Sequence, residues 1–209
     1  MQHPRRQQKD RTAVTETNDF VFFWHGWPSQ WHPSPFQLEG DQYTCAEQYM
    51  MCEKAKLFGD TAVREAILKA GHDPRRHKEL GRKVKGFKDA LWNQRREEIV
   101  FLGNLAKFRQ NPELKALLLA TEEKVWGIGL AAEDPRAKDP KRWLGLNLLG
   151  KALMRARQQL REEEEKEAEG EREREEGAEE EESNEATPSE PQEKPETTKK
   201  NKRKRNARV

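Results

Sequence analysis

Apolar positions recur along this chain with two different periods, which predict two kinds of element. Short runs of aromatic and β-branched residues between turn-forming residues indicate strands, with a turn at Gly40. Longer stretches with apolar residues three and four positions apart indicate amphipathic helices. The pattern predicts strands at residues 21–24, 36–39 and 41–43, helices at about 44–58, 60–70, 74–81, 88–108 and 112–120, and a last helix opening at 147. We therefore expect an α+β fold, a mainly helical single domain with small β elements.

This periodicity stops near residue 160. The remainder is rich in Glu, contains no aromatic residue and has almost no apolar side chains to bury. Such a segment cannot bury enough surface to offset the entropy lost on ordering. We expect a flexible N-terminal arm at 1–18, one folded domain at 19–160, and a disordered tail at 161–209 that is first acidic and then basic. The last helix is free to continue a few turns past Leu160, because Glu and Arg favour helix.

The net charge of the whole chain is only +2, but the predicted domain is strongly basic. Residues 1–160 contain 28 Lys and Arg against 20 Asp and Glu, whereas the remainder contains 12 against 18. A net charge of +8 favours anionic ligands such as phosphates, nucleotides or nucleic acid. The basic cluster at 199–205 is typical of a nuclear address or a nucleic-acid patch, and also of solvated disordered tails. The expected location is therefore the nucleus or cytoplasm, with nucleic acid or a nuclear import receptor as candidate partners of the tail.

Several other classes of protein are excluded by the sequence. No window offers the roughly 18 consecutive apolar residues of a membrane span, and residues 1–18 lack the apolar region of a signal peptide. Cys45 and Cys52 are seven residues apart, which is a poor placement for a disulfide within one helix, so we expect reduced thiols. The histidines lack the spacing of a zinc site, and we predict a metal-independent enzyme without a cofactor.

One predicted helix places an acid and an amine on a single face. Glu47 and Lys54 are seven residues apart, so they project in nearly the same direction, roughly 10 Å apart along the axis. A carboxyl group can protonate a departing base, and a Lys of lowered pKa can attack the anomeric carbon of a sugar. The pair predicts cleavage of an N-glycosidic bond. The structural alternative is a capping box joining Glu47 to the Thr44 amide, with Lys54 lying over Met50 and Met51.

Further positions are candidates for binding a ligand, each with a structural alternative. Trp126 offers a face for stacking on a base or sugar, and Gly127 lets the backbone approach a ligand; the alternative is a core tryptophan. Asn147 opens the last helix, whose N-terminus suits a phosphate, or it is a plain cap. Arg82 suits a phosphate or carboxylate, or it belongs to a solvated basic face. Trp92 forms a pocket wall or packs in the core.

Separated stretches of the chain together carry a family resemblance. They are FVFFW at 20–24, YTCAEQYMMCEKAKLF at 43–58, LGR at 80–82, Trp92, AKF at 106–108, LLLAT at 117–121, VWGIG at 125–129 and LGLNLLGKALM at 144–154. In order and spacing, residues from about 19 to 157 resemble the NADAR family, whose members include the YbiA-like N-glycosidases. The combination covers nearly all of the foldable chain.

The resemblance implies hydrolysis of the N-glycosidic bond between ribose, as ribose phosphate or ADP-ribose, and an aminopyrimidine or guanine-type base. Substrates implied in this way include ADP-ribosylated guanine in nucleic acid. Glu47 falls on the family's acidic residue and Lys54 on the position that would carry a covalent sugar adduct. Tyr49 keeps the aromatic residue of the same motif and would frame the substrate. The other matched positions are Arg82, Trp126, Gly127 and Asn147.

The chain departs from the family pattern at several positions. They are Leu146 in place of a common Lys, Gln48 in place of His, Gln30 and Trp31 in place of Asn and Phe, and Met50 and Met51 in place of a more polar or aromatic pair. These departures leave the exact substrate open. They also leave open a non-catalytic ADP-ribose or nucleotide-binding module, and a third alternative is a basic scaffold that acts through its charged tail.

Overall fold

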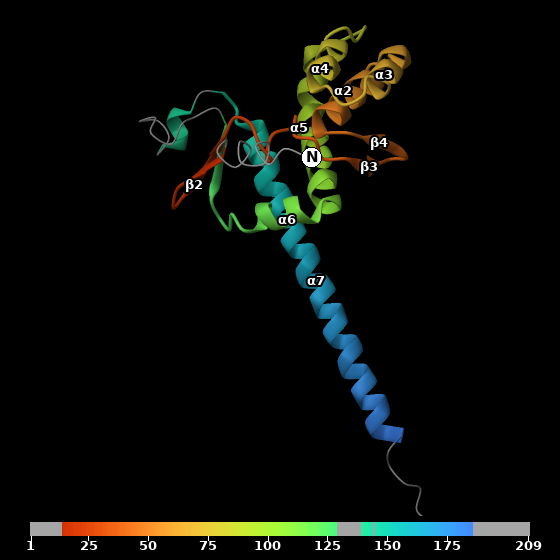
Figure 1. Cartoon of the computed structure of the whole chain (residues 1–209), viewed down its shortest axis with the longest axis vertical. Helices are drawn as coiled ribbons and strands as arrows, with labels where there is room; N and C mark the ends of the chain where they lie inside the picture. Colours follow the sequence, from red (N-terminus) through yellow and green to blue (C-terminus); the bar gives the residue numbers. More distant parts are fainter. Residues whose placement is uncertain (1–13, 129–138, 144, 186–209) are drawn as a thin grey trace, which may run out of the picture. The chain divides into compact units, whose positions relative to one another are not determined.

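The computed structural model describes residues 14–128, 139–143 and 145–185, and the chain divides into two compact units, residues 1–166 and 167–209. The described residues form mainly helices with a few short strands (Figure 1), which confirms the predicted α+β class. The basic cluster at 199–205 and most of the N-terminal arm lie outside the described residues.

Three short strands form the first sheet, in the order β1, β2, β5. Strand β1 (Val14–Glu16) pairs antiparallel with β2 (Phe20–Phe23), so part of the predicted flexible arm is instead an edge strand. Strand β5 (Val125–Ile128) pairs parallel with β2 and sets Val21 opposite Trp126. A parallel pair needs a long crossover, and here more than one hundred residues supply it.

A hairpin leads the chain into the first helix. Strands β3 (Phe36–Leu38) and β4 (Asp41–Tyr43) pair antiparallel, with Leu38 opposite Asp41. The two residues between them, Glu39 and Gly40, have φ values of 51° and 87°. Two positive φ values in a two-residue loop suit the right-handed twist of the strands, which explains the turn predicted at Gly40.

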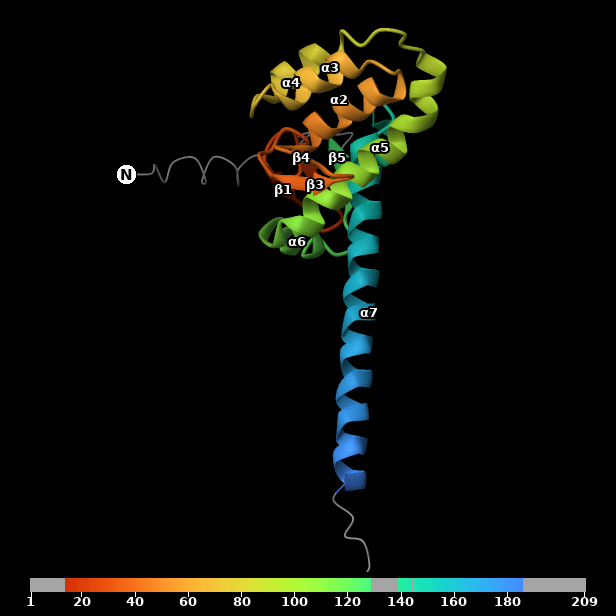
Figure 2. The same ribbon diagram turned by 90° about the vertical axis from the view of Figure 1, so that its right-hand side faces the viewer.

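Six helices account for most of the remaining described residues. They are α2 (Ala46–Leu57), α3 (Thr61–Leu68), α4 (Pro74–Gly81), α5 (Asp89–Gln110), α6 (Pro112–Leu119) and α7 (Leu148–Glu185). The first five begin and end within two residues of the predicted bounds. Helices α3 and α4 lie alongside α2 and contact it and each other (Figure 2). A short 3₁₀ turn, Pro140–Arg142, precedes α7.

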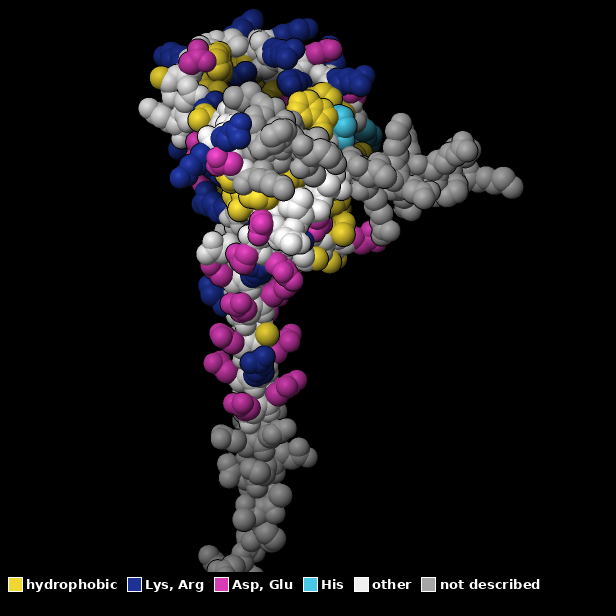
Figure 3. Space-filling view, turned by 90° about the vertical axis from the view of Figure 1, so that its left-hand side faces the viewer, with side chains coloured by type: hydrophobic (Ala, Val, Ile, Leu, Met, Phe, Trp, Pro, Cys, Tyr) yellow, Lys and Arg dark blue, Asp and Glu magenta, His cyan; other side chains and the backbone are white. Residues whose placement is uncertain are grey.

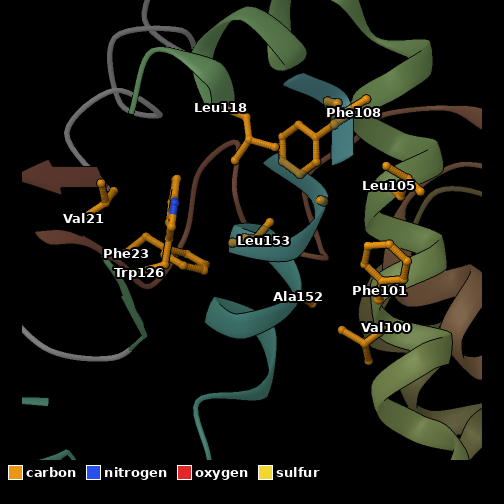
Figure 4. Packing of buried hydrophobic residues seen from close by; sticks show 12 residues of the cluster. Val21, Phe23, Val100, Phe101, Leu105, Phe108, Leu118, Trp126, Ala152 and Leu153 are labelled. Atoms are coloured by element: carbon orange, nitrogen blue, oxygen red, sulfur yellow. The ribbon is translucent and has the colours of Figure 1, made fainter. Parts of the chain in front are cut away.

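Helix α5 separates two hydrophobic clusters. On one side, Phe101, Leu105 and Phe108 point toward Trp126 of β5 and Leu153 of α7 (Figure 4). The second cluster contains residues of the β3–β4 hairpin, α2, α3 and α4 together with others from α5. Because α5 is covered on two sides, its residues from Ile99 to Phe108 are buried, with the exception of Leu102, which is partly exposed.

Helix α7 runs beyond the predicted end of the domain and continues to Glu185. Leu160 is buried, whereas acidic side chains crowd the described part of α7 that follows it (Figure 3). Within the described residues, no helix is long and apolar enough to span a membrane.

Candidate active site

The carboxyl group of Glu47 does not cap the start of helix α2. The N-cap residue is Cys45, and its side chain makes no cap hydrogen bond. The Thr44 backbone N–H donates to Gln48 Oε1 at 2.8 Å, so Gln48 and not Glu47 satisfies this amide. Gln48 Nε2 also donates to the carbonyl of Ile67 at 3.0 Å, which ties α2 to α3. The capping-box alternative is therefore wrong, and the Gln at position 48 has a structural reason.

The carboxyl group of Glu47 is buried, and only one of its two oxygens accepts a hydrogen bond from a described residue. Its side chain is 4% exposed, and Gln30 Nε2 donates to Oε2 at 3.4 Å. The other oxygen, Oε1, is buried without a hydrogen-bond partner. Burial raises the pKa of Glu47, while Lys78, the side chains of Trp31 and Gln30, and the charge of Arg82 act in the opposite direction. A carboxyl group of raised pKa holds its proton closer to neutral pH, which suits a general acid.

Lys54 lies on the same face of α2, two turns after Glu47. Its Nζ is 4.3 Å from the centre of the Phe87 ring and 5.8 Å from that of Trp92. It forms no ion pair with a described carboxylate. Burial and the charge of Arg82 lower the pKa of Lys54, and Asp89 partly opposes this. A lowered pKa enlarges the fraction of neutral amine, the nucleophilic form.

A cavity of about 340 Å³ opens beside Lys54. It lies between α2, α5 and the start of α7, and its size falls within the range of about 300–1,000 Å³ that is usual for small-molecule sites. Its lining is mostly apolar, with three polar side chains. The lining residues are Gln30, Met50, Met51, Lys54, Trp92, Arg96, Val100, Leu148 and Leu149. Glu47 does not itself line the cavity, but its carboxyl group accepts a hydrogen bond from Gln30, which does. A larger hollow of about 520 Å³, beside the β3–β4 hairpin, is lined by neither Glu47 nor Lys54.

A buried lysine holds the loop that carries Gln30. Lys107 is fully buried, and its Nζ donates to the carbonyls of Trp27 at 2.7 Å and Ser29 at 2.9 Å. The Glu47 backbone N–H donates to the Gln30 carbonyl at 3.0 Å, which fixes the same loop from the other side. Sequence reasoning missed this role of Lys107, since nothing in a helical AKF segment predicts a buried amine.

Of the predicted binding residues, Arg82 and Trp92 lie at the site. Trp92 lines the cavity, and the charge of Arg82 acts on both Glu47 and Lys54. Arg96, which was not among the predicted binding residues, lines the cavity as well. Its position one helical turn after Trp92 was the signal that could have identified it.

Tyr49 and Trp126 occupy different surroundings from those predicted. Tyr49 points away from the Glu47 face and packs edge-on against Tyr43, with ring centres 5.2 Å apart. Trp126 is fully buried, edge-on to Phe23 and Trp27 at 5.6 and 5.4 Å. A ring without exposed surface cannot offer its face to a ligand. The predicted roles of Tyr49 and Trp126 in framing the substrate are therefore wrong, and both rings pack in the core.

Gly127 and Asn147 have structural roles at β5 and at the start of α7. A Cβ atom on Gly127 would lie 2.9 Å from atoms of Phe22 and Trp143, so the glycine is required by packing rather than by a ligand. Asn147 has a φ of 49°, and its Nδ2 donates to the Trp126 carbonyl at 2.7 Å. This bond ties β5 to the start of α7, where Leu148 lines the cavity. The Asn147 side chain therefore has a structural role, whereas phosphate binding at the start of this helix stays a prediction.

The two cysteines of α2 are poor nucleophiles. Both are free and buried. Burial raises the pKa of Cys45, and it raises the pKa of Cys52 to about 12. A thiol reacts as its thiolate, so near neutral pH Lys54 is the better nucleophile on this helix.

Comparisons with known proteins identify the family of this chain. The model of the NADAR domain matches residues 22–161. The chain is 39% identical over 168 residues to N-glycosidase R617 of Acanthamoeba polyphaga mimivirus, covering 69% of this chain and 98% of that protein. It is 30% identical over 126 residues to N-glycosidase YbiA of Shigella boydii serotype 4 (strain Sb227), covering 60% and 76%.

A further relative and a solved structure cover different fractions of this chain. Protein irg-1 of Caenorhabditis elegans is 37% identical over 131 residues, which cover 57% of this chain and 61% of that protein. The NMR structure of the E. coli protein YbiA superposes with a TM-score of 0.58 at 27% identity, over 74% of this chain and 92% of that one. The family match spans all the elements that build the cavity, and the resemblance read from the sequence is confirmed: this chain belongs to the NADAR domain family.

Proposed function

We propose that this chain, a hydrolase acting on N-glycosyl bonds, cleaves the bond between ribose, as ribose phosphate or ADP-ribose, and an aminopyrimidine or guanine-type base. The observation that carries the proposal is the arrangement of Glu47 and Lys54. Among the described residues, one oxygen of the buried Glu47 carboxyl group has no hydrogen-bond partner and the Lys54 amine has no ion pair, and both groups lie on one helix face. Lys54 lines the cavity of about 340 Å³, and Gln30 of its lining contacts Glu47. Relatives named as N-glycosidases support the same bond type.

The first step assigns Glu47 as general acid. Protonated Glu47 donates its proton to the departing base while the bond from C1 to nitrogen breaks, so the bonding pair leaves with the base. The electron-poor C1 accepts the lone pair of the neutral Lys54 amine, and the carboxylate of Glu47 takes up the proton that this amine then loses. Gln30, which contacts both the carboxyl group and the cavity, keeps the acid oriented.

The second step releases the sugar. Glu47 returns its proton to the Lys54 nitrogen as the bond from C1 to this nitrogen breaks and its electron pair stays on the amine. Water then adds to C1, and the proton that water loses goes back to the carboxylate. The balance is one water consumed per bond, with free amine and carboxyl groups restored. The charges of Lys78 and Arg82 near Glu47 favour a substrate that carries phosphate.

The test uses the full chain with two matched pairs of variants. Glu47→Gln and Lys54→Met remove the reacting groups, whereas Glu53→Gln and Lys56→Met change the mutually paired Glu53 and Lys56 of the same helix. Each protein is incubated with an ADP-ribosylated guanine oligonucleotide and with a ribosylaminopyrimidine phosphate, and the released base and sugar are followed by mass spectrometry. We expect Glu47→Gln to lower turnover by about 10²–10⁴-fold with binding retained, and both control variants to keep their rates.

Borohydride trapping tests the covalent step. An open-chain Schiff base on Lys54 would be reduced to a stable sugar adduct, located by peptide mass spectrometry. Turnover without an adduct would favour direct attack of water on C1. Binding of both substrates without release from either would instead favour the non-catalytic ADP-ribose or nucleotide-binding module. Nuclear location and partners of the tail stay predictions, because the basic cluster at 199–205 lies outside the described residues.

A further inference from the structure

Arg96 is a cation at the cavity that the proposed mechanism does not use. It lies on α5 about one helical turn from Trp92 and one from Val100, and all three line the cavity. Its Nε atom is buried and has no hydrogen-bond partner. A buried donor without an acceptor costs free energy, so its retention calls for an acceptor that arrives from outside the protein.

Several other arginines of the described residues have a protein partner. They are Arg64 on Asp41, Arg76 on Glu79, Arg109 on Glu163, Arg155 on Glu98, Arg157 on the carbonyl of Lys124 and the hydroxyl of Thr121, and Arg161 on Glu123. The guanidinium of Arg96 makes neither an ion pair nor a hydrogen bond with the described residues. It faces the cavity with its donors unused.

The other cavity walls indicate what kind of molecule brings the acceptor. Met50, Met51, Leu148 and Leu149 are apolar, and Trp92 adds an aromatic surface. Apolar walls suit the faces of a planar ring, and methionine adapts to such a surface. The lining therefore fits a flat base with its edge toward Arg96.

We propose that Arg96 reads the edge of the leaving base, and that the cavity selects bases with two adjacent acceptors, a carbonyl oxygen and a ring nitrogen, as in guanine. A guanidinium carries donors alone, in a planar fork that matches such a pair. Adenine places an amino donor where guanine has the carbonyl oxygen, so one donor of the fork would meet another donor. This inference rests on the proposed function in one point: it takes the cavity beside Glu47 and Lys54 as the place of the base.

Binding measurements on the full chain test this selectivity independently of turnover. Isothermal titration is made with the 5′-monophosphates of guanosine, inosine, 7-deazaguanosine and adenosine, and with ribose 5-phosphate as a ligand without a base. Inosine keeps both acceptors, and 7-deazaguanosine lacks the ring nitrogen. We expect guanosine and inosine monophosphates to bind about 10–100-fold more tightly than adenosine monophosphate, with the 7-deaza compound in between.

Two variants of Arg96 and one control distinguish the effect of the planar guanidinium fork from the effect of its positive charge. Arg96→Met is expected to bring the guanosine-to-adenosine ratio close to one, with ribose 5-phosphate binding unchanged. Arg96→Lys keeps the charge and loses the fork, so it should also lose the ratio, and it provides a second test if the Met variant does not fold. Arg95→Met removes the exposed neighbour on α5 and should keep the ratio.

Several outcomes would overturn the inference. One is equal affinity for guanosine and adenosine monophosphates in the unaltered chain. Another is an equal loss for every ligand, ribose 5-phosphate included, in Arg96→Met, which would place a phosphate at Arg96. If Arg96→Lys kept the preference for guanosine monophosphate, the planar fork of donors would not be the source of the selectivity. Selective binding without turnover of any glycoside would refute the proposed function and keep the base-reading role, whereas turnover with a base preference indifferent to Arg96 would refute the base-reading role alone.

Discussion

At the residue scale, Glu47 shows how burial prepares a side chain for chemistry at the expense of stability. Its carboxyl group is 4% exposed and has one oxygen without a partner. Water would hydrate that oxygen in the unfolded chain, so folding loses hydration that the protein does not replace. The same desolvation raises the pKa and favours the protonated acid.

Glu47→Gln should therefore stabilise the protein. Because the folded-state pKa is raised, the folded protein binds more protons than the unfolded chain at pH values between the two pKa values, and stability falls as pH rises through that window. Removing the charge should raise Tm at neutral pH by about 2–4 °C, corresponding to about 1 kcal/mol. The difference should vanish at acidic pH, where Glu47 is protonated in both states. Thermal melts across pH check this, and a lower Tm for Glu47→Gln at neutral pH would contradict it.

Arg82 couples the two reacting groups electrostatically. Its positive charge lowers the pKa of both Glu47 and Lys54, so Arg82→Gln should raise both. The two limbs of the profile of kcat/KM against pH should then move together to higher pH, and added salt should weaken the shift. The exposed Arg75, on α4, serves as the control, and Arg75→Gln should leave the profile in place. Movement of one limb alone would show that Arg82 lies near a single group.

Lys107→Met tests the loop that carries Gln30. The substitution keeps an unbranched chain and leaves the carbonyls of Trp27 and Ser29 without their present donor. We expect a loss of about 2–3 kcal/mol in the free energy of unfolding, measured by urea denaturation, because hydrogen bonds from a charged donor are lost. Lys115→Met changes a lysine on the exterior that pairs with Glu164 and should cost about 1 kcal/mol or less.

At the scale of elements, the site depends on how closely α2 and α5 approach. A Cβ atom on Gly103 of α5 would lie 2.4 Å from Cδ1 of Tyr49 on α2. Tyr49 is matched to the family's motif, and its position in the core explains why an aromatic residue stands there. It sets the distance between the helices that contribute Lys54 and Trp92 to the cavity.

Gly103→Ala should destabilise the protein by about 1–3 kcal/mol, although alanine favours helix, because the methyl group has no room beside Tyr49. The matched control is Gly170→Ala on α7, where nothing lies within 4 Å of the added atom and helix propensity alone predicts no loss. Urea denaturation of both variants measures the difference. Equal stability of the two would mean that α2 and α5 separate at little cost.

At the scale of the whole molecule, the folded unit extends slightly past the boundary predicted from composition. Glu163 pairs with Arg109 at 2.5 Å, and Glu164 pairs with Lys115 at 2.7 Å. Both carboxylates follow Leu160, the predicted end of the domain. Composition assigned them to the acidic tail, whereas their partners on α5 and α6 belong to the first unit.

A fragment of residues 1–166 should therefore keep the Tm and turnover of the full chain. A fragment of residues 1–160 should keep turnover and lose about 1–4 °C in Tm, because each exposed pair contributes about 0–1 kcal/mol. Thermal melts and the glycosidase assay on both fragments check this. Loss of turnover in the 1–166 fragment would instead favour the scaffold hypothesis, in which the charged tail carries the function.

The sequence predicted most helices well because their caps and periodicity are local. Bounds for α2 to α6 lie within two residues of expectation. It could not predict the parallel pairing of β2 with β5, since that contact joins residues more than one hundred positions apart. Nor could it separate Glu47 from a capping role, because Gln48 at the next position satisfies the same amide.

The sequence by itself determined the fold class, the family and the placement of Glu47 and Lys54 on one helix face, because all three follow from local periodicity and from motifs in order. The tertiary structure decided which aromatic residues face the site and which fill the core: Trp92 reached the cavity, and Tyr49 and Trp126 did not. It also brought Gln30 and Arg96 to the cavity from separate segments. The physical reason is that burial depends on what packs against a side chain, and here those neighbours come from distant parts of the chain.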